Sequence, residues 1–288
     1  MKQNKDDKAF TAVNRAIMIF VLLVSLYPFC YVLALSFNSD FDFPSRNVWL
    51  FPGVFSTGAY LRVFQNDTLL SAFWVSVRRT VLAAVLGVTL NSFMGYAISK
   101  KYLIGRRFFI IFVTVTMYIS GGLIPWFLMM RNLHLRGNIW GLVIPNLFSA
   151  FYVIILRSFF EQIPESLEES AKIDGANDAV VFFRIVVQMS TPVLATIALF
   201  IGVAHWNDWF LGEVLMTKSN QIPLQTLLLR VIFMQQASLL VNVGGVIKTS
   251  SESVKMAAII ISTVPILCVY PFLQRYFVKG ILLGAVKG

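Results

Sequence analysis

The stretch EQIPESLEESAKIDGAND, residues 161–178, decides how this chain is organised. It carries six acidic residues and one basic residue, Lys172, in a 288-residue chain whose formal net charge is +10. Long apolar segments lie on both sides of it, as expected for a loop between membrane helices. Because cytoplasmic loops of membrane proteins normally collect Lys and Arg, the acidity of this loop indicates another role, such as docking to a partner.

The composition predicts a membrane protein, since 57% of the residues are hydrophobic and only 13% are charged. The apolar residues fall in blocks of about 20, the length of helix that spans ~30 Å of hydrocarbon. A transmembrane barrel would instead show alternating segments of about 10 residues. We therefore predict an all-α integral membrane protein with one transmembrane domain, residues 1–288. The six predicted spans are about 17–37, 73–99, 108–130, 139–160, 181–212 and 254–277.

The basic residues flank the apolar blocks and form no single basic face, so nucleic acid is not an expected partner. The turn at 100–107 holds Lys100, Lys101, Arg106 and Arg107 between two predicted spans. Short basic turns of this kind lie on the cytoplasmic side. This orientation also places both termini and the 161–178 loop in the cytoplasm.

Within the acidic loop, the residue types predict a short helix, a sharp turn and a second helix. Pro164 suits the first turn of a helix, Gly175 suits the position just after its end, and Asp178 can cap the helix that follows. One apolar stripe is formed by residues four apart, Ile163, Leu167 and Ala171. An amphipathic connector lying on lipid headgroups would also explain the stripe. It explains the acidity poorly, because anionic headgroups repel carboxylates.

The string ESAKIDGA at 169–176 resembles the E-A-A-x-x-D-G-A coupling signature of ABC importer permeases. The resemblance extends over nearly the whole chain and is greatest to the carbohydrate-uptake branch, similar to the second permease of maltose-type systems. Within that branch it favours the subgroup for oligosaccharides and polysaccharide fragments. It is carried by GGLIP at 121–125, IPESLEE at 163–169, PVLATI at 192–197, HWNDWF at 205–210, YFVKG at 276–280 and GAVKG at 284–288.

The resemblance implies a type I permease that is not itself an enzyme. Its ATPase-coupling residues would be Glu169, Ser170, Ala171, Asp174, Gly175 and Ala176, with Glu169 pairing a basic residue of the ATPase. The chain has no G-x-x-x-x-G-K-[ST] phosphate loop, so ATP and Mg²⁺ would be bound by partner subunits. The implied assembly holds a second homologous permease as a heterodimer, two copies of a cytoplasmic ABC ATPase and an extracytoplasmic sugar-binding protein. It would lie in a bacterial cytoplasmic membrane, in contact with lipid.

Two positions depart from the family pattern. Ser170 replaces the usual Ala, which is a small-for-small change. Gln188-Met189 stands where relatives have a Leu-Pro pair, so we expect the fifth helix to enter the membrane straighter than theirs.

Candidate pathway residues lie on two of the predicted spans. Aromatic and polar side chains suited to sugars cluster at the outer end of span five, at Trp206, Asn207, Asp208 and Trp209. The alternative is an aromatic interfacial belt with one capping Asp. In span three the candidates are Tyr118, Gly121 and Gly122, where the glycines and Pro125 allow a kink or close approach, and tight packing is the alternative.

Three further polar residues lie near or within span two. For Arg78 and Arg79 we favour snorkelling to the interface over contact with an acidic polysaccharide. Asn91 is expected to bond another helix. Elsewhere, a re-entrant or interfacial helix is predicted at 223–234, followed by a turn at 242–245.

Other function classes fit less well. An ABC permease for another small solute stays open. An ion-coupled secondary transporter would need acidic residues at the centre of a span, and the six predicted spans have none there. An intramembrane enzyme or a metal site would need a catalytic or ligand cluster, and the sequence offers neither.

Overall fold

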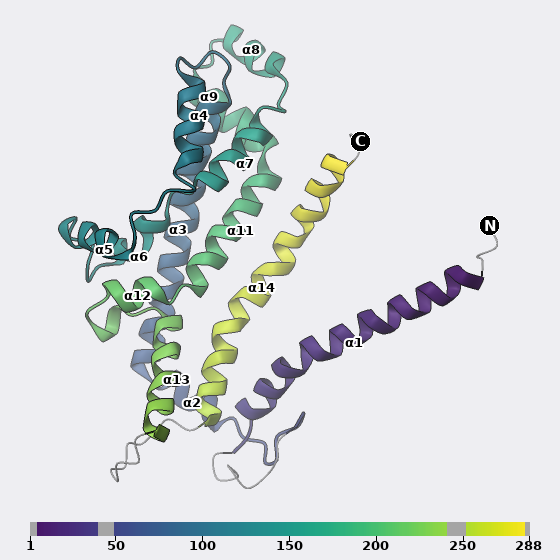
Figure 1. Cartoon of the computed structure of the whole chain (residues 1–288), viewed down its shortest axis with the longest axis vertical. Coiled ribbons are helices and arrows are strands. Elements are labelled where there is room, and N and C mark those ends of the chain that lie inside the picture. Colours follow the sequence, from purple (N-terminus) through teal and green to yellow (C-terminus); the bar gives the residue numbers. More distant parts are fainter. Residues whose placement is uncertain (1–4, 40–48, 241–251, 286–288) are drawn as a thin grey trace. The chain divides into compact units, whose positions relative to one another are not determined.

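The computed structural model describes residues 5–39, 49–240 and 252–285, and these residues are mostly helical (Figure 1). Their one β-interaction is an isolated bridge between Asn38 and Phe55. The predicted all-α class is therefore confirmed. The chain divides into two compact units, residues 1–70 with 230–264 and residues 71–229 with 265–288.

The first unit contains α1 (Lys5–Ser36) and α2 (Gly58–Phe64). The end of α1 is tied to the segment that precedes and begins α2. The Ser36 hydroxyl lies 2.7 Å from the Tyr60 hydroxyl, and the Asn38 side chain accepts a hydrogen bond from the Gly53 backbone N–H at 2.9 Å. Pro28 lies inside α1, which membrane helices tolerate.

The second unit is built around three helices, α3 (Asp67–Ser99), α7 (Ala150–Phe160) and α11 (Thr191–Asn207). Two glycines of α3 allow the neighbouring helices to approach closely. A Cβ at Gly87 would lie 3.0 Å from the Ile201 side chain, and one at Gly95 would lie 3.0 Å from Cβ of Leu156. Small residues at such contacts are typical of membrane helix packing.

Shorter helices surround these three. They are α4 (Arg106–Val115), α5 (Leu123–Asn132), α6 (Ile139–Val143), η2 (Ile144–Asn146), α8 (Glu165–Ile173), α9 (Asp178–Val181), the π-helical η3 (Phe182–Val186), α10 (Val187–Met189), α12 (Phe210–Leu215), η4 (Ser219–Gln221) and the start of α13 (Leu224–Leu240). The last helix of the chain is α14 (Glu252–Ala285).

In the described part of the chain, Phe10–Ser36, Asp67–Ser99 and Glu252–Val269 are long and apolar enough to cross a membrane as single helices. Two more candidates are bent pairs. Ile139–Asn146 and Ala150–Phe160 meet at 55°, and Asp178–Met189 and Thr191–Asn207 meet at 84°. The predicted fifth span is therefore not one straight helix, because it breaks at Ser190. That it enters the membrane straighter than in relatives stays a prediction.

The predicted third span, 108–130, is not one helix. Two helices of 10 residues each, α4 and α5, overlap this range and are separated by residues 116–122. Gly122, which begins α5 as its N-cap, has a φ of +84°, a backbone conformation that glycine adopts without steric cost. A count of six spans thus stays a prediction. The helix expected at 223–234 is present as the start of α13, and the turn at 242–245 lies outside the described residues.

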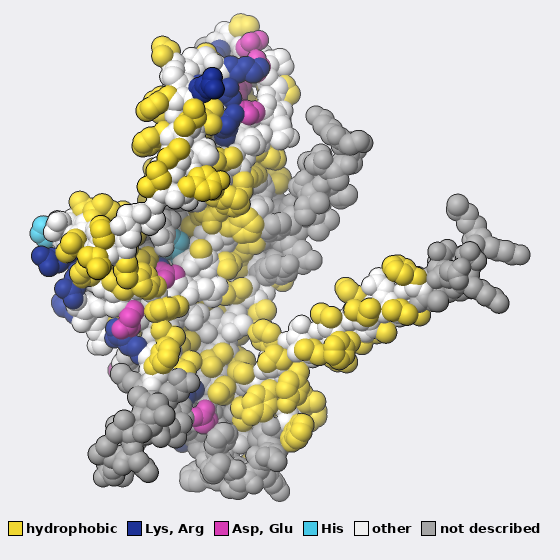
Figure 2. Space-filling model, in the orientation of Figure 1, with side chains coloured by type: hydrophobic (Ala, Val, Ile, Leu, Met, Phe, Trp, Pro, Cys, Tyr) yellow, Lys and Arg dark blue, Asp and Glu magenta, His cyan; other side chains and the backbone are white. Residues whose placement is uncertain are grey.

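Charged side chains gather at two places on the second unit, over the α8 end and again beside α5 and α12, as Figure 2 shows. Hydrophobic side chains cover much of the surface between them, including α4. An apolar band between two polar ends is the arrangement that a lipid bilayer requires.

Candidate functional site

The local sequence of the acidic loop fixes both ends of α8. Pro164 precedes the helix as its N-cap residue, and acidic residues in the first turn favour the positive end of the helix dipole. At the other end, Gly175 has a φ of +85°. The Gly175 N–H donates to Lys172 O at 3.0 Å and the Ala176 N–H donates to Ala171 O at 2.9 Å, which is the Schellman arrangement. The predicted helix and sharp turn are therefore present.

The predicted cap of the next helix is wrong by one residue. Asn177, not Asp178, is the N-cap of α9, and its side chain accepts a hydrogen bond from the Val180 N–H at 2.9 Å. Asp178 is the first helical residue and forms an ion pair with Lys172 at 2.8 Å. The hydrogen bond to Asp178 raises the pKa of Lys172.

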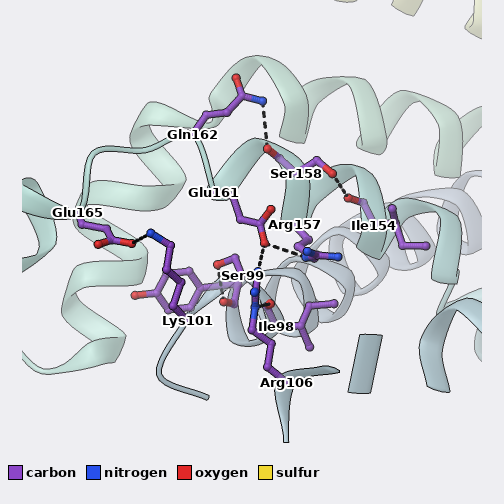
Figure 3. A network of polar contacts seen from close by, with 11 residues as sticks. Ile98, Ser99, Lys101, Arg106, Ile154, Arg157, Ser158, Glu161, Gln162 and Glu165 are labelled. Atoms are coloured by element: carbon purple, nitrogen blue, oxygen red, sulfur yellow. Dashed lines mark hydrogen bonds and ion pairs between the residues drawn. The ribbon is translucent and has the colours of Figure 1, made fainter. Parts of the chain in front are cut away.

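Most acids of the loop bind bases of the same chain. The carboxylate of Glu161 accepts from Arg157 Nε at 2.8 Å and also binds the Arg106 guanidinium (Figure 3). Glu165 binds Lys101 at 2.8 Å, and this hydrogen bond lowers the pKa of the Glu165 carboxyl. These pairs show that the basic turn at 100–107 and the acidic loop lie on the same side of the unit. The acidity of the loop thus has an internal cause, which the sequence argument missed.

Glu168 is a functional residue that sequence reasoning missed. It is only 7% exposed, although it lies in a polar helix, and its carboxylate binds the ammonium of Lys100. Lys100 directly follows α3, and its Nζ lies 4.2 Å from the centre of the Tyr96 ring. The pair joins α8 to the end of α3. The Lys100–Arg107 run supplied the only sequence signal for it.

The six predicted coupling residues lie together on α8 and the turn after it. Ala171 and Ala176 are half-buried and pack against the core of the second unit. Glu169, Ser170, Asp174 and Gly175 are exposed. Among the described residues, neither Glu169 nor Asp174 has an ion-pair partner. Two adjacent acids of α8 therefore differ in role, since Glu168 faces inward to Lys100 and Glu169 faces outward.

The predicted pathway residues lie in two different surroundings. The first set, Tyr118, Gly121 and Gly122, lies in the link between α4 and α5, and the Tyr118 side chain is exposed there. Both glycines face open space. A Cβ added at either one would have no heavy atom of the described residues within 4 Å, apart from its immediate chain neighbours. In the second set, Trp206 at the end of α11 is buried, whereas Asn207 and Trp209 are exposed.

Asp208 follows α11 and holds a buried ion pair. Its carboxylate binds Arg79 of α3, whose side chain is 0% exposed. Arg79 also donates to Leu142 O at 3.1 Å and to Asp208 O at 2.9 Å. The other carboxylate oxygen, Oδ1, accepts from the Phe210 N–H at 2.8 Å and so caps α12. The predicted snorkelling of Arg79 to the interface is therefore wrong, because its side chain is buried in this ion pair. Arg78 is exposed, and for it snorkelling stays a prediction.

Asn91 bridges two helices, as predicted. Its amide donates to Leu147 O and accepts from the Ser149 N–H, both at 2.9 Å. These two backbone groups lie at the break between η2 and α7, where the regular helical hydrogen bonds are interrupted. A buried asparagine in α3 thus satisfies the backbone of a bent membrane segment.

Comparison with known proteins defines the class. Residues 77–283 match the family described as binding-protein-dependent transport system inner membrane component. The chain is 38% identical over 284 residues to the polygalacturonan/rhamnogalacturonan transport system permease protein YtcP of Bacillus subtilis (strain 168), covering 98% of this chain and 99% of that one. It is 36% identical over 291 residues to protein LplC of the same organism, covering 100% and 98% of the two chains.

A solved structure agrees with this class. The crystal structure of a bacterial ABC transporter involved in the import of the acidic polysaccharide alginate contains a chain that matches with a TM-score of 0.87 at 32% identity, covering 96% of this chain and 99% of that one. The chain therefore belongs to the family of inner-membrane permease components of binding-protein-dependent transport systems.

Proposed function

We propose that this chain is a permease subunit of an ATP-driven importer of oligosaccharides or polysaccharide fragments, and that α8 is its docking element for the ATPase. The observation that carries the docking proposal is the division of roles on α8. Glu168 anchors the helix to the end of α3, and Glu169 faces outward without an ion-pair partner among the described residues. An exposed carboxylate on a fixed helix is suited to a basic residue of a second protein.

The small residues beside Glu169 support the same role. Ser170 leaves little side chain between the helix and a partner surface, and Ala171 and Ala176 seat the helix on the core. Gly175 provides the turn and Asp174 lies exposed next to it. Movement of a docked ATPase would then be passed to the helices that α8 is attached to.

The proposed partners follow from what this chain lacks and from its family. The sequence holds no phosphate-loop motif, so ATP and Mg²⁺ belong to separate ATPase subunits, which we propose to be two in number. A second homologous permease completes the pathway as a heterodimer. A saccharide-binding protein outside the membrane delivers the solute, in line with the family description.

We place the protein in a bacterial cytoplasmic membrane with α8 and both termini on the cytoplasmic side. The ion pairs from Lys100, Lys101 and Arg106 to the acidic loop support this orientation, because they put a basic turn and α8 at one membrane face. The saccharide class is supported by YtcP, named for polygalacturonan and rhamnogalacturonan transport, and by the alginate importer. We retain Tyr118, Gly121, Gly122, Trp206, Asn207, Asp208 and Trp209 as proposed pathway residues.

Reconstitution tests the proposal. The chain is assembled in proteoliposomes with its second permease, ATPase and binding protein, and ATP hydrolysis and uptake of labelled saccharide are measured. We expect the saccharide-loaded binding protein to stimulate hydrolysis and uptake to require ATP. Saccharide entry without ATP, or hydrolysis indifferent to the loaded binding protein, would refute the function.

A matched pair of variants tests the docking residue. Glu169→Gln and Glu165→Gln make the same chemical change on one helix. Loss of a charge-assisted hydrogen bond predicts about tenfold weaker stimulation for Glu169→Gln. Glu165→Gln, which removes only an exposed pair with Lys101, is expected to stay within twofold.

A further inference from the structure

We propose that Arg78 is a carboxylate-binding residue in a saccharide site, and that this site gives the importer its preference for acidic saccharides. The inference rests on the proposed function and deepens it. Arg78 lines a cavity of about 760 Å³ between α3, the start of α6 and the segment through η4. That volume lies within the range of small-molecule binding pockets, ~300–1,000 Å³.

The first argument is the contrast between two adjacent arginines. Arg79 is buried and its charge is balanced by Asp208. Arg78 is exposed in the cavity and forms no ion pair with a described residue. Asp208 is already committed to Arg79 and to the cap of α12. A cavity that contains an unbalanced guanidinium favours an anionic ligand, and a guanidinium binds a carboxylate through two parallel hydrogen bonds.

The second argument is an acceptor left without a donor. Oε1 of Gln221, which also lines the cavity, is buried and accepts no hydrogen bond from the described residues. Buried polar atoms normally have a partner. A sugar hydroxyl can donate to this oxygen only after the Gln221 side chain turns toward the cavity, because Oε1 has almost no accessible surface. Asn220 of the same wall offers an exposed second amide.

The third argument is an exposed aromatic side chain on the cavity wall. Trp140 lines the cavity and is 42% exposed. Asn138 caps α6 by accepting a hydrogen bond from the Trp140 N–H at 2.6 Å, which fixes the start of the helix. Aromatic faces pack against the C–H faces of sugar rings. Together, a guanidinium, amide groups and an indole match the carboxylate, hydroxyls and ring of a uronate.

The competing explanation for Arg78 is snorkelling to lipid phosphate, which needs only the charge and no cavity chemistry. Lipid binding would not use Gln221 or depend on the saccharide carboxylate. The two explanations therefore predict different ligand dependence, and the experiment separates them by changing the ligand as well as the residue.

The experiment measures equilibrium binding of a labelled uronate trisaccharide, and of its carboxyl-reduced neutral form, to the purified transporter assembled with its partner subunits. The variants are Arg78→Gln, Arg78→Lys and a control, Arg131→Gln. Arg131 is an exposed arginine in the last turn of α5 that does not line the cavity. We expect Arg78→Gln to weaken uronate binding about tenfold, Arg78→Lys to weaken it less, and the neutral form to change less than twofold.

Several results would overturn the inference. Equal loss of both trisaccharides in Arg78→Gln would assign Arg78 to structure, and no loss of either would remove Arg78 from the saccharide site. A loss of uronate binding in Arg131→Gln as large as in Arg78→Gln would show a general charge effect. If the wild-type transporter imports saccharide but binds neutral and acidic forms alike, the inference fails and the proposed function stands. If it imports no saccharide, the proposed function itself fails.

Discussion

The carboxylate of Glu168 in α8 binds the ammonium of Lys100 at the end of α3, and both side chains are largely withdrawn from solvent. One residue along, Lys101 binds Glu165, but these side chains are 78% and 66% exposed. Two lysines next to each other in sequence thus hold the same helix through one sheltered pair and one exposed pair. The sheltered pair attaches the proposed docking helix to a long helix of the core.

The first prediction follows from this contrast. Lys100→Met leaves the Glu168 carboxylate buried and unpaired, which costs about 2–4 kcal/mol, whereas Lys101→Met removes a surface pair worth about 0–1 kcal/mol. We expect a clear fall in the unfolding temperature of the purified protein, and weaker stimulation of the ATPase, only for Lys100→Met. The charge swap Lys100→Glu with Glu168→Lys should recover part of the loss. Equal effects of the two lysine variants would refute the anchoring role of Glu168.

The second prediction concerns the bent segment at η2 and α7. Asn91→Ala removes the partners of Leu147 O and the Ser149 N–H, and each backbone group left unpaired away from water costs about 1–3 kcal/mol. Thr89→Ala is the control, because Thr89 is exposed and its hydroxyl bonds Val85 O of its own helix and no other described residue. Thermal unfolding should show a large loss for Asn91→Ala and a change below about 0.5 kcal/mol for the control. Comparable stability of both variants would contradict the bridging role.

The third prediction separates the two roles of Asp208. Asp208→Asn keeps an oxygen to cap α12 but removes the charge that balances buried Arg79. An uncompensated buried charge lowers the free energy of unfolding by about 3 kcal/mol or more. We therefore expect a reduced yield of folded protein. Adding Arg79→Met to Asp208→Asn should restore much of that yield, as judged by size-exclusion chromatography. If the double variant folds no better than the single one, the loss came from something other than charge balance.

The helices of the fold were largely predictable from the sequence, because long apolar blocks in a charge-poor chain have few alternatives. The ends of α8 were predictable too, since Pro164 and Gly175 act locally through their own backbone preferences. Asp178 was chosen as a cap although its neighbour Asn177 is an equally good one, and local chemistry alone does not separate the two.

The breaks in the helices were harder to predict, because they depend on partners far away in the sequence. Nothing within 139–160 indicates that Asn91 will satisfy its interrupted backbone. The third apolar block did contain helix-disrupting residues, Gly121, Gly122 and Pro125. Their spacing predicts a kinked helix as readily as the interruption that is present at 116–122. An average over a hydropathy window hides both kinds of break.

The positions of charged side chains were the least predictable, because the sequence gives the sign of each charge but not whether the side chain points into the protein or outward. Glu168 and Glu169 are neighbours with the same charge, yet one binds Lys100 inside and the other faces outward. Arg78 and Arg79 divide in the same way. In both cases adjacent helical positions point about 100° apart, so the partner on a neighbouring segment decides which of the two is buried.

The most direct measurement of the central claim is site-specific crosslinking from position 169 in the assembled transporter. A photoreactive group attached to Glu169→Cys is compared with one attached to Arg131→Cys, at an exposed position on α5. The account predicts that position 169 crosslinks to the ATPase subunit, that position 131 does not, and that nucleotide changes the yield. Crosslinks from position 169 to lipid alone, or labelling of that position from outside the cell, would contradict it.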